Sequence, residues 1–179
     1  MKKNIIALSA SNSSNSINQT LLNFTLPSLE GFNVKVISVR DYPLPMYGLD
    51  EEAKNGFPKF ATELRALFST ADAFIIATPE HNGSIPAVFK NTVDWLSRMA
   101  NKEQPTFFKK PVLLLSTSPC ANGGATNLAA LTQLMPWWGA STVASYSLVS
   151  YFDNTVESQL VTKEAERLAT TIKAFTSTL

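Results

Sequence analysis

Residues 73–98, "AFIIATPEHNGSIPAVFKNTVDWLSR", contain a predicted strand, a polar loop and a predicted helix in that order. The run "AFIIAT" at 73–78 is continuously apolar, which is typical of a strand covered on both faces in a parallel sheet. After the loop, apolar residues recur at helical spacing and indicate an amphipathic helix; they are Ile85, Val88, Phe89, Val93 and Leu96. The segment therefore predicts one strand–helix unit of a parallel sheet.

Four further apolar runs repeat this arrangement, at residues 5–8, 34–39, 112–117 and 142–149. A second helical stripe near the C-terminus comprises Val156, Leu160, Leu168, Ile172 and Phe175. Five such units predict an α/β fold, the flavodoxin-like doubly wound sheet with five parallel strands in the order 2-1-3-4-5 and helices on both faces. A chain of 179 residues with 45% hydrophobic composition is enough for one well-buried core. We therefore expect residues 1–179 to form a single domain.

The composition argues against several classes of function. Fifteen basic and 14 acidic residues give a net charge of +1, so the chain lacks the basic excess that drives nucleic-acid binding. A single cysteine, Cys120, and a single histidine, His81, leave no cluster for a zinc or iron–sulfur site. The apolar run after Lys3 is shorter than a signal-peptide core, and no stretch approaches membrane-spanning length. We expect a cytoplasmic protein that binds neither nucleic acid nor membrane.

The loops after the first, third and fourth strands are the most informative, because doubly wound sheets bind ligands beyond the carboxyl ends of their strands. They are "SASNSSNSIN" (9–18), "TPEHNGSIP" (78–86) and "STSPCANGGAT" (116–126). The first contains neither G-x-x-x-x-G-K-[ST] nor G-x-G-x-x-G, so an ATP site and a Rossmann NAD site are poorly supported. Its hydroxyls and the N–H groups of the following helix suit a phosphate. The alternative is that these residues only cap the helix and shape a turn.

Residues 77–98 resemble the signature of the NADPH-dependent FMN reductase family, close to "PEYNGSIPGxLKNAIDW". The first loop resembles the family's "GSxRxxSxN" phosphate loop, the third its "SxSPGxxGG" loop, and "VRDYPLPMYGLDEE" (39–52) its "LRDLPLPLYNxDxE" segment. The chain departs from these patterns at Ala10, at Ser13 and at His81, where the family usually has glycine, often has arginine and usually has tyrosine. Since serine cannot hold a phosphate bidentately, the choice between NADPH and NADH stays open.

The resemblance implies an enzyme that holds FMN, takes a hydride from NADPH or NADH, and passes electrons by ping-pong kinetics to a small acceptor. It further implies that the acceptor is a quinone, flavin, azo compound or metal oxyanion, and that the protein is a homodimer or homotetramer. The implied cofactor-binding residues are Ser11, Ser13, Ser16, Ile17, Asn18, Pro79, Glu80, His81, Asn82, Gly83, Ser84, Ser118, Gly123 and Gly124. No catalytic residue is required, because hydride transfer is the cofactor's own chemistry. A flavodoxin-like FMN electron carrier is the alternative, although such carriers are strongly acidic.

Several residues carry narrower expectations. Gly83 would let the chain approach the flavin ring without a Cβ, and Ser84 would cap the next helix. His81 is expected to have a packing or backbone role, with a minor role in proton transfer as the alternative, and Cys120 is expected to be inert. Trp95 lies off the apolar stripe of its helix, so we expect it at a subunit interface. A partly exposed packing residue is the alternative.

Overall fold

The computed structural model describes residues 1–179 and contains a five-stranded sheet in the order β2-β1-β3-β4-β5. All neighbouring strands in this sheet are parallel. The strands are β1 (Asn4–Ser9), β2 (Asn33–Ser38), β3 (Ala73–Ala77), β4 (Lys110–Thr117) and β5 (Ala140–Leu148). The predicted flavodoxin-like topology is confirmed.

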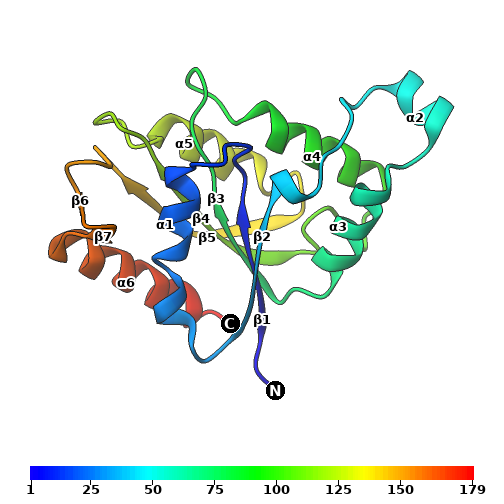
Figure 1. The fold of residues 1–179 in the computed structure, drawn as a ribbon. Coiled ribbons are helices and arrows are strands. Elements are labelled where there is room, and N and C mark those ends of the chain that lie inside the picture. Colours follow the sequence, from blue (N-terminus) through cyan, green and yellow to red (C-terminus); the bar gives the residue numbers. More distant parts are fainter.

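Helices cover both faces of this sheet (Figure 1). On one face pack α1 (Ile17–Asn23) and α6 (Thr162–Thr176). On the other face pack α3 (Lys59–Ser69), α4 (Ala87–Arg98) and α5 (Ala125–Leu134). The short helix α2 (Leu49–Asn55) buries no residue and projects from the body at the upper right of Figure 1. No helix combines the length and the apolar character that crossing a bilayer requires.

The apolar runs form strands because both of their faces are covered. All five residues of β3 are buried, with Phe74 and Ile76 in the cluster beneath α3, α4 and α5 and Ile75 in the cluster beneath α1 and α6. Phe74 also meets Phe68 and Phe107 at ring-centroid distances of 4.9 and 5.3 Å. Continuous rather than alternating apolarity is the consequence of this two-sided burial.

The C-terminal stripe differs from the prediction. Helix α6 begins at Thr162, whereas Val156 and Leu160 lie in a small antiparallel pair, β6 (Thr155–Val156) and β7 (Gln159–Leu160). Glu157 and Ser158 between these strands have positive φ, which closes a tight turn and interrupts the helical spacing. Val156 is 63% exposed and takes no part in the core.

A buried carboxylate joins α6 to β5. The Tyr146 hydroxyl donates to Glu164 Oε2 over 2.8 Å, and Arg167 Nε donates to the same oxygen over 2.9 Å. Burial favours a higher pKa for Glu164, but the hydrogen bonds from Tyr146 and Arg167 outweigh it, so the pKa lies below its ordinary value of 4.5. A pKa lowered by folding contributes stability that is present above the unfolded-state pKa and is lost as the pH falls through the folded-state pKa.

We expect Glu164→Gln to lower the free energy of unfolding at pH 7 by about 1 kcal/mol, because an amide accepts weaker hydrogen bonds than a carboxylate. The dependence of that free energy on pH should also flatten below about pH 5. Urea titrations at several pH values measure both effects. Glu166→Gln, on the exposed side of the same helix, is the control and should retain the wild-type acid limb. An unchanged acid limb in Glu164→Gln would contradict the assignment.

Candidate functional site

The three polar loops meet at a cavity of about 230 Å³ beyond the carboxyl ends of β1, β3 and β4. Nine of the predicted cofactor-binding residues line it, namely Ser11, Ser13, Ser16, Ile17, Asn18, Pro79, Glu80, His81 and Ser118. Asn15, Thr117 and Pro119 also line it, although they were not predicted. Asn15 belongs to the same polar loop as the predicted serines, so the sequence did contain a signal for it.

The first loop ends in a capped helix. Ser16 is the N-cap of α1, and its hydroxyl accepts a hydrogen bond from Gln19 N–H over 3.2 Å. The N–H groups of Ile17 and Asn18 in the first turn donate to no acceptor within the chain. Unpaired N–H groups at the positive end of a helix suit an anion. Capping and anion binding are therefore compatible here, since they use different groups.

The Asn18 side chain makes two hydrogen bonds within the chain. Its Nδ2 donates to Thr117 O over 3.1 Å, and its Oδ1 accepts from Thr117 N–H over 3.0 Å. This buried pair joins the start of α1 to the end of β4. The second Nδ2 hydrogen and the backbone N–H of Asn18 donate to no acceptor within the chain, so the role of Asn18 in cofactor binding stays a prediction.

The second loop forms a tight two-residue turn. The N–H of His81 donates to Ser84 O and the N–H of Ser84 to His81 O, each over 3.0 Å. The central residues Asn82 and Gly83 have φ of 51° and 72°, the feature of a type I′ turn, for which Asn-Gly is the preferred pair. A Cβ on Gly83 would meet no atom within 4 Å. The outer face of this turn is open.

Ser84 does not cap the next helix, so that prediction is wrong. Helix α4 begins at Ala87 after Pro86, and no side chain caps it. The Ser84 backbone is committed to the turn, two residues before the helix N-cap. Asn82, Gly83 and Ser84 are exposed and do not line the cavity.

The third loop packs tightly onto the sheet through two glycines. Gly123 and Gly124 have φ of 56° and 79°. A Cβ on Gly123 would lie 2.5 Å from Ser147 Oγ, and one on Gly124 would overlap Ser116 Oγ. These glycines leave room for β4 and β5, and neither lines the cavity.

Trp95 is fully buried, so the expectation of an exposed interface residue is wrong. Its Nε1 donates to Pro45 O over 2.8 Å, and Asn91 Nδ2 donates to the same oxygen over 3.0 Å. Tyr47 packs edge-on against the indole, with the ring centroids 5.1 Å apart. The segment after β2 therefore covers the side of α4 that the apolar stripe leaves bare.

The cavity offers neutral donors rather than cations. No lysine or arginine lines it, and its lining is dominated by serine hydroxyls and the free N–H groups of α1. Glu80 and His81 are its only titratable side chains. This donor set fits a phosphate, which neutral hydroxyls and helix N–H groups can hold. No group of three or more His, Cys, Asp or Glu side chains is placed to hold a metal ion.

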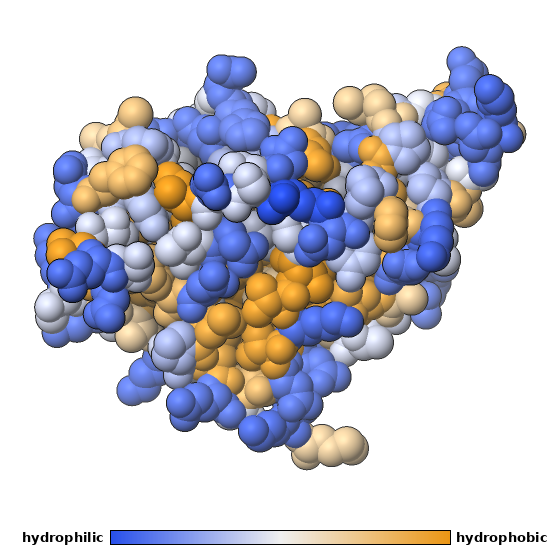
Figure 2. All heavy atoms as spheres, in the orientation of Figure 1, coloured by the Kyte–Doolittle hydropathy of each residue, from blue (hydrophilic) through white to orange (hydrophobic).

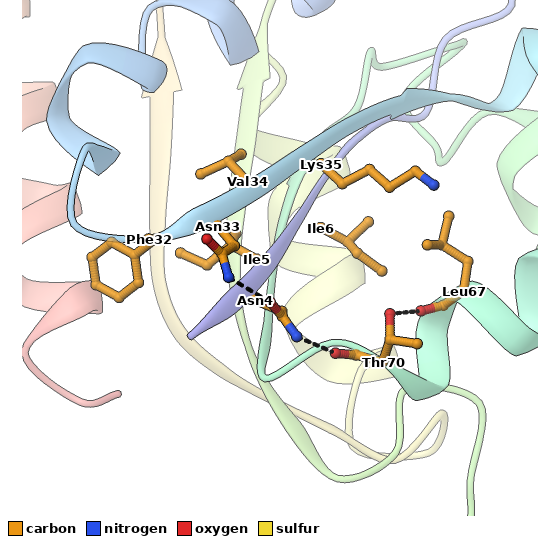
Figure 3. A pocket seen from close by; sticks show the side chains of 9 residues that line it. All are labelled: Asn4, Ile5, Ile6, Phe32, Asn33, Val34, Lys35, Leu67 and Thr70. Carbon is orange, nitrogen blue, oxygen red and sulfur yellow. Dashed lines mark hydrogen bonds between the residues drawn. The ribbon is translucent and has the colours of Figure 1, made fainter. Parts of the chain in front are cut away.

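The largest hollow, about 670 Å³, lies beside the amino-terminal halves of β1 and β2, and Figure 3 shows the side chains around it. Its lining residues are Asn4, Ile5, Ile6, Phe32, Asn33, Val34, Lys35, Leu67 and Thr70. Figure 2 shows a concentration of hydrophobic atoms over this part of β1 and β2. The amide of Asn4 is occupied by bonds with Thr70 O and Asn33. We assign no chemistry to this hollow, because it lies away from the carboxyl ends of the strands.

Comparison with known proteins places this architecture among flavin reductases. The family model for NADPH-dependent FMN reductase matches residues 3–154. An uncharacterized protein of Mycoplasma pneumoniae is 31% identical over 150 residues, which cover 83% of this chain and 88% of that protein. A quinone reductase of Escherichia coli is 35% identical over 112 residues, or 62% of this chain and 58% of that enzyme. The match thus spans less than two thirds of the quinone reductase.

A solved structure shows the same fold. The flavoenzyme NAD(P)H:(acceptor) oxidoreductase from Paracoccus denitrificans superposes with a TM-score of 0.77 at 26% sequence identity. The superposition covers 98% of this chain and 96% of that one. The likeness in fold therefore spans nearly the whole chain.

Proposed function

Since the chain belongs to the NADPH-dependent FMN reductase family, we propose that it is a single-domain, FMN-dependent NAD(P)H oxidoreductase that reduces a small acceptor. The observation that carries this proposal is the cavity at the carboxyl ends of β1, β3 and β4, where three polar loops present hydroxyl and N–H donors without a cation. FMN combines a phosphate with a redox-active ring, and it suits such a site better than a nucleoside triphosphate would.

We assign the phosphate end of the cofactor to the first loop. Ser11, Ser13 and Ser16 would donate hydroxyls, and Ile17 and Asn18 would donate backbone N–H groups. A cavity of about 230 Å³ is smaller than the roughly 300 Å³ at which drug-sized pockets begin, so it suits the phosphate and not the whole cofactor. The ring end is left to residues 79–84 and Ser118, where the open side of Gly83 allows close approach.

FMN held by the first loop and by residues 79–84 would supply the chemistry of hydride transfer between the nicotinamide and the acceptor. The protein's residues bind and orient, and none is required as an acid, base or nucleophile. We propose that the nicotinamide and then the acceptor occupy one place in succession beside the exposed turn at His81–Ser84, which would give ping-pong kinetics. We propose a quinone as the first acceptor to test, because a relative is named quinone reductase.

We expect this chain to share the oligomeric state that its family resemblance implies. We propose a homodimer or homotetramer, with the interface elsewhere than Trp95, because that side chain is covered within its own chain. Sedimentation velocity on the FMN-loaded protein tests this assignment. A monomer at micromolar concentration would contradict it.

Anaerobic flavin spectroscopy tests the activity. We expect the purified protein to bind FMN, and either NADPH or NADH to bleach the visible flavin band without a second protein. Initial rates at several quinone concentrations should give parallel double-reciprocal lines against the nicotinamide. Bound colour without bleaching would instead indicate an electron carrier. Absence of FMN binding would exclude both functions.

A further inference from the structure

Helix α5 begins without a cap of its own. Its N-cap residue is Gly124, which has no side chain to accept a bond from the first turn. The missing acceptor comes from another loop, because Glu80 Oε2 accepts a hydrogen bond from Asn127 N–H over 3.0 Å. A carboxylate at this position also interacts favourably with the positive end of the helix. Glu80 therefore caps α5 from a distance of 47 residues in the sequence.

The same carboxylate holds the third loop directly. Asn122 Nδ2 lies 3.0 Å from both Glu80 oxygens. In return, Asn127 Nδ2 donates to Thr78 O over 3.3 Å. The second loop is thus fixed at Thr78 and at Glu80, on each side of Pro79. Sequence reasoning found Glu80 but not these partners, which lie far away in the chain.

Glu80 stands between the cavity and the turn at His81–Ser84. It lines the cavity, and the residue after it begins the turn. We propose that Glu80 is a positioning residue that clamps the second loop to the third loop and to α5, so that the turn is held in place for the flavin ring. This inference rests on the proposed FMN function.

A direct contact with the cofactor phosphate is the competing role for Glu80. Its two oxygens already accept bonds from Asn122 and Asn127, and a carboxylate repels a phosphate. The clamp therefore predicts an effect on the ring end of the cofactor and not on the phosphate end. Riboflavin, which lacks the phosphate, separates the two roles.

We expect Glu80→Gln to raise the Kd for FMN and the Kd for riboflavin by the same factor, about tenfold, because the introduced amide cannot accept every bond that the carboxylate accepts. Asn122→Asp should also weaken the binding of both flavins, because it places a second carboxylate next to that of Glu80 and the two repel each other. Combining the two changes should restore both affinities to within about threefold, because the new amide can donate to the new carboxylate while its oxygen caps Asn127. Glu63→Gln on α3 is the matched control and should bind both flavins as the wild type does.

Amide hydrogen exchange of the flavin-free protein supplies a readout that does not depend on the cofactor. Exchange at Asn127 should accelerate in Glu80→Gln and return towards the wild-type rate in the double variant. Wild-type flavin affinity in Glu80→Gln, or weaker binding of FMN alone, would overturn the clamp. If the wild type binds no flavin, the proposed function fails, and unchanged exchange at Asn127 would then overturn the loop contact as well.

Discussion

Trp95→Ala should lower the free energy of unfolding by about 4 kcal/mol, in the range measured for truncating buried aromatic side chains. The indole is 0% exposed, and the change would remove its packing against Tyr47 at 5.1 Å. It would also remove the hydrogen bond from Nε1 to Pro45 O. Urea unfolding followed by far-ultraviolet circular dichroism measures the loss without using tryptophan as the reporter.

Two variants separate the contributions to this loss. Trp95→Phe keeps much of the apolar contact and leaves Pro45 O with the bond from Asn91 Nδ2, so we expect a loss of about 1–2 kcal/mol. Trp137→Ala removes a tryptophan that is 87% exposed and should change the stability by less than about 0.5 kcal/mol. If Trp95→Ala kept its stability and instead dissociated an oligomer, the structure's placement of Trp95 would be wrong.

The fold was predictable because each strand carries its own signal. Ile75 and its neighbours are apolar on both faces, and that pattern requires no knowledge of their partners. The loops were predictable for a related reason, since the carboxyl ends of parallel strands converge and the chain order fixes which loops meet. The turn at Asn82 and Gly83 is likewise encoded locally by the Asn-Gly pair.

Long-range partners were not predictable from local patterns. The spacing on α4 identified the stripe that faces the sheet, but the segment that covers Trp95 comes from Pro45 and Tyr47, 50 and 48 positions away. Asn18 belongs to a motif that resembles a phosphate loop, yet its amide is used by Thr117, 99 positions away. A periodic pattern describes one face of a helix and gives no information about a second covering segment.

Gly124 is another residue whose long-range neighbour could not be predicted from the local sequence. The family resemblance implied that Gly124 is a cofactor-binding residue. The atom that makes glycine necessary is Ser116 Oγ, on the strand that precedes the loop. That hydroxyl also donates to Thr78 O over 2.6 Å, so the third loop, β4 and the second loop meet at one point.

Gly124→Ala should therefore destabilise the protein by about 3 kcal/mol, through two costs that act together. An L-residue at φ of 79° is strained by about 1 kcal/mol, and overpacking against a buried strand costs typically 1–3 kcal/mol more. Because the new Cβ would displace Ser116, it should also break the bond to Thr78 and weaken FMN binding. Chemical unfolding and FMN titration measure the two effects.

Two other glycines divide this loss into its parts. Gly83→Ala keeps the strain, with φ of 72°, but its Cβ would meet nothing within 4 Å, so about 1 kcal/mol is expected. Gly31→Ala meets neither condition, since its φ is not in the left-handed region and its surroundings are open, and it should be close to neutral. Equal losses at Gly124 and Gly83 would mean that β4 can move aside at little cost. The third loop would then rest on the sheet less tightly than the Ser116 contact requires.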